Sequence, residues 1–205
     1  MKTTSVITGD IINSRNIAVD TWLPTLKNIL KTFGNTPKNW EVYRGDSFQL
    51  ETTPEKALFA CLLVKSGIKK IGNIDVRLAV GIGKKSFEAD TVSESNGEAF
   101  INSGHAFDNL QKKQHLSFKT PWNNINEELD VSVSLALLTM DDWTANSAEF
   151  VYVSLLNPDK TQKEIGELLN ISQAGISKRR KRAGFEEIMK LENRYKNIIN
   201  SKLNA

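Results

Sequence analysis

Cysteine and long apolar runs are the features that this sequence of 205 residues most lacks. Its one cysteine, Cys61, excludes an internal disulfide and every metal site built from several cysteines. No apolar run approaches the roughly 18–20 residues that a membrane-spanning helix needs. The first residues, MKTTSVI, do not have the pattern of a secretory signal. With 40% hydrophobic and 25% charged residues, the composition is that of a globular protein, and we expect it to be cytoplasmic with no membrane partner.

A large net charge is also lacking, but the positive charges are unevenly placed. The formal net charge is +3. Residues 1–140 hold 16 Lys and Arg against 15 Asp and Glu, and residues 141–205 hold 11 against 9. Residues 178–182 read KRRKR, five consecutive cations. The cationic character is therefore local, and its position is more informative than its sum.

The first 120 residues alternate between strand and helix patterns. Strands are expected at residues 5–12, 41–51 (two strands around Gly45 and Asp46), 75–83 and 115–119, and helices at residues 22–33, 53–70 and 97–113. This order favours an α+β fold with helices packed on a largely antiparallel sheet. The polar segment 120–130 is expected to be a boundary, and 131–152 is compatible with helix. We predict an α+β domain at residues 1–125 and an all-α domain at residues 126–205.

Residues 161–182 carry the most specific local pattern in the chain. Thr161 and Glu164 have the spacing of a capping box, and Ile165, Leu168 and Leu169 are expected to form an apolar face behind it. Asn170 suits the left-handed conformation that ends a helix. Ser172 is a typical cap for a second helix, whose Ile176 returns to the core. The pattern predicts two short helices joined by a three-residue turn.

This segment resembles the helix-turn-helix of bacterial transcriptional regulators, with Gly166 and Asn170 as departures from the usual residues. The resemblance implies that the second helix is a recognition helix whose early residues face base edges and whose basic run holds phosphates. The expected base-facing residues are Ser172, Gln173 and Ser177, with Ala174 beside them, and the expected phosphate-binding residues are Lys178, Arg179, Arg180, Lys181 and Arg182. The alternative is a helical hairpin used only for packing or dimerisation, with the cations as solvated surface.

Two acidic residues are candidates for a second site. Asp10 ends the first expected strand, and Asp46 lies at the hairpin turn. If the hairpin pairs beside that strand, the two carboxylates and the backbone carbonyl of Ile11 make an oxygen site suited to Mg²⁺. The segment that follows is a candidate phosphate cradle formed by Asn13, Ser14 and Arg15. The alternative is purely structural, with both acids in turns or paired with Arg44 and Arg77.

Four segments carry a second resemblance: VITGDIINSR, YRGDSFQ, VRLAVGIG and NGEAFINSG. In this order they look like a class III nucleotidyl cyclase domain. Residues 5–110 more closely resemble the SatD family of bacterial proteins, which also has a C-terminal helix-turn-helix. The resemblance implies a ferredoxin-like or cyclase-like sheet and a metal-bound nucleotide. The Asn and Arg pair of cyclases is replaced by Ile101 and His105, and the base-selecting Lys by Val42, so cyclisation is not expected.

The sequence as a whole predicts a DNA-binding transcriptional regulator that acts as a homodimer on double-stranded DNA. Its first domain is expected to be a degenerate cyclase-like unit for ligand sensing or dimerisation, with a nucleotide as ligand. One alternative is a Mg²⁺-dependent nucleotide-binding or nucleotidyl-transfer enzyme that uses Asp10 and Asp46. The other is an interaction module with neither activity.

Overall fold

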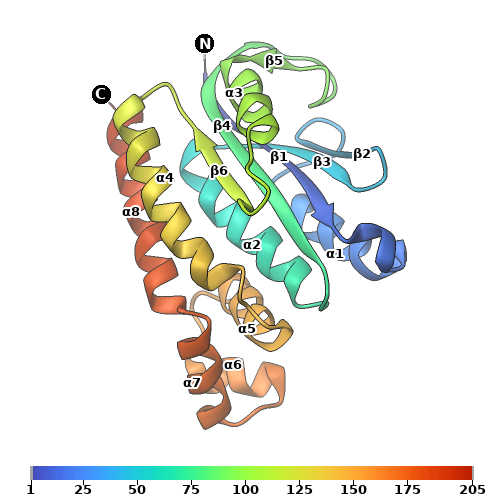
Figure 1. Cartoon of the computed structure of the whole chain (residues 1–205), viewed down its shortest axis with the longest axis vertical. Helices are drawn as coiled ribbons and strands as arrows, with labels where there is room; N and C mark the ends of the chain where they lie inside the picture. Colours follow the sequence, from blue (N-terminus) through green and yellow to red (C-terminus); the bar gives the residue numbers. More distant parts are fainter. Residues whose placement is uncertain (1, 205) are drawn as a thin grey trace.

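One mainly antiparallel sheet occupies the first part of the chain in the computed structural model, which describes residues 2–204 (Figure 1). The central strand β1 pairs antiparallel with β3 on one side and with β4 on the other. Strand β2 lies outside β3, β6 pairs in parallel with β4, and the short β5 pairs antiparallel with the end of β4. The strands are β1 (Thr3–Ile12), β2 (Trp40–Tyr43), β3 (Ser47–Thr52), β4 (Asp75–Phe87), β5 (Asn96–Gly97) and β6 (Leu116–Lys119).

Helices cover both faces of this sheet. Figure 1 shows α1 and α2 behind the sheet and α3 in front of it. A side chain at Gly81 would block the close approach of α3 to β4, because its Cβ would lie 2.1 Å from the carbonyl oxygen of Ala99. The elements of this layer are η1 (Ser14–Asn16), α1 (Val19–Lys31), η2 (Pro54–Lys56), α2 (Ala57–Lys69) and α3 (Glu98–Asp108).

Five helices follow the sheet: α4 (Asn123–Met140), α5 (Ala145–Leu156), α6 (Gln162–Leu169), α7 (Gln173–Arg182) and α8 (Phe185–Leu203). Helices α4 and α8 run side by side, and Arg194 of α8 is ion-paired with Glu128 of α4 at 3.0 Å. Helices α6 and α7 lie at the opposite end of the molecule from β5 (Figure 1). Among residues 2–204, no helix combines the length and apolarity needed to cross a membrane.

The expected α+β architecture and the helical character of residues 131–152 are confirmed, and one local expectation is wrong. The helix expected at residues 97–113 ends at Asp108. The segment 131–152 forms parts of two helices, because Thr144 begins a new helix and its hydroxyl accepts the backbone N–H of Ser147. The expected boundary segment 120–130 is mostly helical, since α4 begins at Asn123. The domain division at residue 125 falls in the first turn of α4 and stays a prediction.

Side chains of the later helices complete the core beneath the sheet. Tyr195 of α8 is fully buried, and its hydroxyl donates a hydrogen bond to the carbonyl oxygen of Pro54 at 2.7 Å. The Tyr195 ring packs on Phe118 of β6 with 5.4 Å between ring centroids. The C-terminal helix is thus bound directly to the sheet and to the segment that begins α2.

Candidate functional site

Helix α6 begins with the capping box that its sequence predicts. The Thr161 hydroxyl accepts the backbone N–H of Glu164 at 3.3 Å, and a Glu164 carboxylate oxygen accepts the backbone N–H of Thr161 at 2.8 Å. Together these bonds satisfy two backbone donors that the start of a helix leaves free. They fix the start of α6, directly after the loop that follows α5.

The turn that joins α6 to α7 also follows the sequence pattern. Asn170 adopts the left-handed conformation with φ 52°, and the Ser172 hydroxyl accepts the backbone N–H of Gly175 at 3.2 Å. Gly166 of α6 lets the turn pack closely on the helix, because a Cβ there would lie 2.9 Å from the carbonyl oxygen of Ile171. One expectation is wrong: Leu168 is 54% exposed, so the buried face of α6 is made by Ile165 and Gly166, with Leu169 half-buried.

Helix α7 has a buried side and an exposed side. Ile176 is fully buried, and the helix is followed by the buried Ala183, whose carbonyl oxygen accepts the indole N–H of Trp143 at 2.9 Å. The opposite side is formed by residues that are all exposed to solvent: Ser172, Gln173, Ala174, Ser177, Lys178, Lys181 and Arg182. We call these seven residues the α7 outer face. It has a neutral polar first turn and a cationic last turn.

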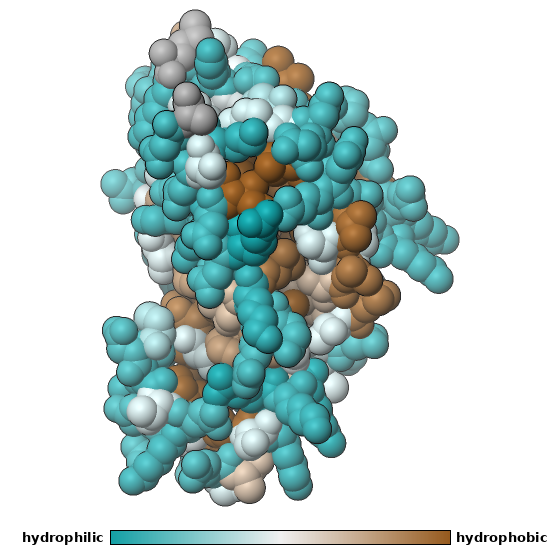
Figure 2. Space-filling view, turned by 90° about the vertical axis from the view of Figure 1, so that its left-hand side faces the viewer, coloured by the Kyte–Doolittle hydropathy of each residue, from teal (hydrophilic) through white to brown (hydrophobic). Residues whose placement is uncertain are grey.

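The five consecutive cations do not all belong to this face. The Arg179 guanidinium donates to the Glu149 carboxylate of α5 at 2.7 Å. Arg180 is half-buried, and its guanidinium lies 3.4 Å from the carboxylate of Glu186. Lys178, Lys181 and Arg182 remain exposed, and no acidic partner lies within 4.0 Å of their charged groups in the part of the chain that the structure describes. This end of the molecule, at the bottom of Figure 2, is mainly hydrophilic.

The capping box makes the stability of this end of the molecule dependent on pH. The backbone and hydroxyl hydrogen bonds of Thr161 lower the pKa of Glu164. A carboxylate whose folded-state pKa is depressed contributes stability above its ordinary titration range and loses it as the pH falls through the folded-state pKa. We therefore expect Glu164→Ala to lower the thermal unfolding midpoint at neutral pH and to have no such effect in strong acid. Circular dichroism melting curves at both pH values measure this, and an equal effect at both would contradict it.

The two acids of the second candidate site do lie at neighbouring positions. Asp10 is paired across the sheet with Ser47, which follows Asp46, and the Ile11 backbone N–H donates to the Asp46 carbonyl oxygen at 3.2 Å. The Asp46 carboxylate accepts the Ser14 hydroxyl at 2.6 Å. Ser14 is therefore engaged by an acid rather than free to hold a phosphate. The other two residues of the expected cradle, Asn13 and Arg15, are exposed, and Asn13 has a left-handed backbone with φ 63°.

The carboxylate of Asp10 is already ion-paired with Arg77 of the same chain. Arg77 lies opposite Asp10 on β4, and its Nε donates to one carboxylate oxygen at 2.9 Å while its Nη2 donates to the other. The hydrogen bond to Asp10 raises the pKa of Arg77, and the negative charges of Asp10 and Asp46 add to this effect. With both Asp10 oxygens paired, these residues do not fit a second cation in this conformation. Magnesium binding by Asp10, Ile11 and Asp46 stays a prediction that requires Arg77 to release Asp10.

The geometry at Asp10 leads to a simple expectation for metal binding. A ligand stabilises a protein only when it binds the folded state, and in the folded state Arg77 already holds both carboxylate oxygens of Asp10. We therefore expect millimolar Mg²⁺ to leave the thermal unfolding midpoint unchanged. Differential scanning fluorimetry across a Mg²⁺ series measures this, with Ca²⁺ at equal ionic strength as the control. A saturable rise that Asp46→Asn abolishes would instead support the magnesium prediction.

A charged cluster that the sequence patterns did not indicate lies between α2, β4 and α4. Asp75, His115 and Asp141 are close enough together to be metal ligands. The ammonium of the buried Lys65 lies 3.0 Å from Asp75 and 2.7 Å from Asp141, and Lys69 lies 2.9 Å from Asp75. Two lysines are thus ion-paired with the two carboxylates, while His115 Nδ1 and Asp141 Oδ1 are buried without a hydrogen-bond partner among the described residues. Its only sequence signal was Lys65, a charged residue inside an otherwise apolar stretch of helix.

Comparison with known proteins adds no assignment to this geometry. No protein-family model matches the chain, and no curated protein matches its sequence at a significant level.

Proposed function

We propose that this protein binds double-stranded DNA through α6 and α7, which form a helix-turn-helix with α7 as the recognition helix. The observation that carries the proposal is the α7 outer face. A helix that enters the major groove needs one side anchored to the protein and the other side free of intramolecular partners. Ile176 and Ala183 anchor α7, while the outer face is polar at its start and cationic at its end.

The two parts of this face have different roles in the proposal. Gln173 and Ser177 lie in the first half of α7 and read base edges. A glutamine side-chain amide can make two hydrogen bonds with one adenine base. Lys178, Lys181 and Arg182 contact phosphates, which position the protein without reading sequence. Arg179 and Arg180, through Glu149 and Glu186, hold α7 in place and carry less of the phosphate contact.

The α+β part of the chain is proposed to be a cyclase-like unit that senses a ligand or holds two copies together. The strand order β2–β3–β1–β4, antiparallel throughout, supports a ferredoxin-like sheet and a relationship to the SatD family. The Asp10–Arg77 pair disfavours the alternative nucleotidyl-transfer enzyme. A homodimer is proposed because paired half-sites match a two-fold symmetric protein.

Selection of bound fragments from a genomic DNA library tests the proposal. The protein is incubated with sheared genomic duplexes, bound fragments are sequenced, and the enriched sites are re-measured by fluorescence anisotropy at several salt concentrations. Enrichment of a pair of half-sites, bound in a salt-dependent way, supports DNA binding by a dimer. Absence of saturable binding to any duplex at low salt overturns it.

A further inference from the structure

A second concave site lies where the sheet meets α2, α5 and α8. Its volume is about 800 Å³, within the range of pockets that hold small molecules. The ends of β1, β3 and β4 form one wall, and η2 with the start of α2 forms another. Leu155 and Leu156, the last residues of α5, and Lys196 of α8 close it. We call this cavity the sheet-edge pocket.

Apolar side chains form part of the lining of the sheet-edge pocket. Phe33 and Phe59 lie edge to face with 6.4 Å between their ring centroids, and Leu63 and Leu155 lie beside them. Two further apolar side chains of its lining are left in water, Phe87 at 59% exposure and Leu156 at 44%. Covering such side chains is favourable by roughly 25 cal/mol per Å² of apolar surface. An occupant with an apolar body is therefore favoured.

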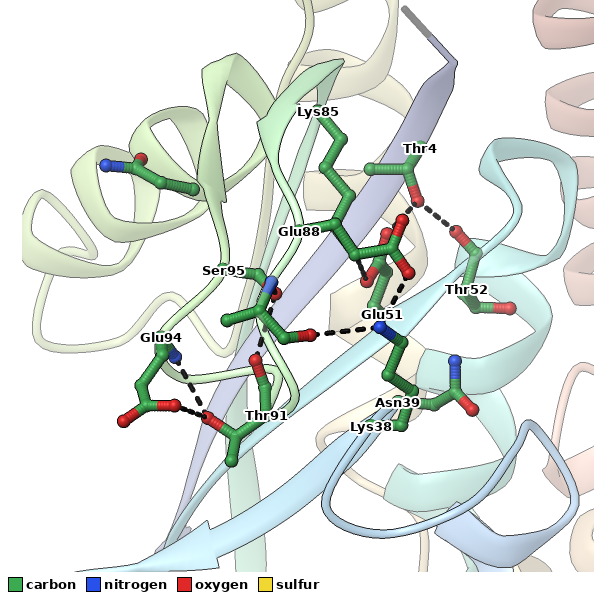
Figure 3. Close-up of polar contacts among 12 residues, drawn as sticks. Thr4, Lys38, Asn39, Glu51, Thr52, Lys85, Glu88, Thr91, Glu94 and Ser95 are labelled. Atoms are coloured by element: carbon green, nitrogen blue, oxygen red, sulfur yellow. Dashed lines mark hydrogen bonds and ion pairs between the residues drawn. The ribbon is translucent and has the colours of Figure 1, made fainter.

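The rim of the pocket carries more positive than negative charge. Five lysines line it (Lys2, Lys38, Lys56, Lys85 and Lys196) against three glutamates (Glu51, Glu55 and Glu88). Figure 3 shows part of this rim, where Lys85 is paired with Glu51 at 2.7 Å and Lys38 with Glu88 at 2.7 Å. The Lys38 hydrogen bond, with the charges of Lys85 and Lys2, lowers the pKa of Glu88. The field at the rim therefore favours an anion.

Lys56 and Lys2 are the two rim lysines without an acidic partner among residues 2–204, and either can meet such an anion without losing an ion pair. Lys56 ends η2 and is exposed, and among residues 2–204 no carboxylate oxygen lies within 4.0 Å of its ammonium. Lys38, Lys85 and Lys196 each already have an acidic partner. A ligand anion at Lys56 gains an ion pair without breaking one that the protein has made.

We propose that the sheet-edge pocket binds an amphiphilic anion, with its acyl or aromatic body on Phe33, Phe59 and Leu156 and its negative head at the lysine rim. The binding itself does not depend on DNA binding by α7. A ligand in the pocket would nevertheless contact the end of α5, the helix that holds α7 through the Glu149–Arg179 ion pair.

Binding of decanoate, followed by isothermal titration calorimetry below its micelle-forming concentration, tests this inference. We expect decanoate to bind saturably at one site per protein chain. Decanol, which has the same number of carbons but no charge, should bind roughly tenfold more weakly or worse. Leu156→Asp, which places a negative charge against the apolar body, and Lys56→Glu, which reverses one of the two rim charges that are unpaired among residues 2–204, should each weaken decanoate binding about tenfold or more. Ile101→Asp is the matched control, because Ile101 is 66% exposed on α3 and does not line the pocket.

Circular dichroism establishes whether each variant is folded. Leu156 and Lys56 are both on the surface, and if one variant fails to fold, the other still tests the proposal. Equal binding of decanol and decanoate would overturn the anionic head. Decanoate binding that neither Leu156→Asp nor Lys56→Glu weakens, or no saturable binding at all, would overturn the site. These outcomes are read without DNA, so they are distinct from a failure of DNA binding.

Discussion

A variant with alanine at positions 178, 181 and 182 is expected to bind duplex DNA roughly tenfold or more weakly than the parent protein at low salt. The Lys178→Ala, Lys181→Ala and Arg182→Ala substitutions remove the three cations of the α7 outer face that no acid of the described chain holds. The slope of log affinity against log salt should fall by about three, one for each lost phosphate contact. Fluorescence anisotropy titrations across a salt series measure both quantities. The loss should be similar for all DNA sequences, since phosphate contacts do not read bases.

The chain offers a control that is matched in charge. Lys27, Lys112 and Lys113 are exposed lysines outside α6 and α7. Replacing all three by alanine lowers the net charge from +3 to 0, the same change that the test variant makes. If this control weakens DNA binding as much as the test variant does, the attraction comes from the overall charge and the role of α7 is contradicted.

Tyr195→Ala is expected to lower the free energy of unfolding by about 3–5 kcal/mol, the usual cost of emptying a buried aromatic site. The side chain is fully buried, packs on Phe118 and donates to the Pro54 carbonyl oxygen. Because these contacts join α8 to the sheet and to η2, the destabilisation should reach both parts of the chain. Urea unfolding followed by tryptophan fluorescence and by far-ultraviolet circular dichroism should show the same shifted midpoint with both probes.

Tyr195→Phe is the matched variant, because it keeps the ring and removes only the hydroxyl. It should cost about 1 kcal/mol, since the Pro54 carbonyl oxygen loses the hydroxyl hydrogen bond but keeps the backbone N–H of Ala57 as a donor. Two separate transitions, of which only one moves in Tyr195→Ala, would show that the helical part and the sheet unfold independently. That result would support the division near residue 125 as two folding units and contradict the coupling expected here.

Those features of the candidate site that depend on near neighbours in the chain could be predicted from the sequence. The capping box, the left-handed Asn170 and the Ser172 cap each involve residues at most three positions apart. Their hydrogen bonds depend on local backbone geometry, so the residue types alone indicate them. The α+β class follows in the same way from the alternation of strand and helix patterns.

The contacts that divide the basic run could not be predicted in this way. Arg179 turns inward because Glu149 lies opposite it, 30 residues earlier in the chain, and only the packing of α5 on α7 places them together. Arg77 meets Asp10 because the register of β1 and β4 sets them directly opposite. The sheet-edge pocket has walls from elements at both ends of the sequence, so no single segment carries its pattern.

Cleavage of DNA from a reagent attached to α7 tests the central claim most directly. Ser177→Cys creates an exposed thiol, while the native Cys61 is 1% exposed and burial raises the pKa of its thiol, so an iron chelate attaches selectively. The same chelate at Ser134→Cys, an exposed position on α4, is the control. With α7 in the major groove, the Ser177→Cys conjugate should cut at the centre of each bound half-site, and the control should cut far less. Equal cutting by both conjugates, or no cutting by a Ser177→Cys conjugate that is itself shown by fluorescence anisotropy to bind the DNA, would contradict the account.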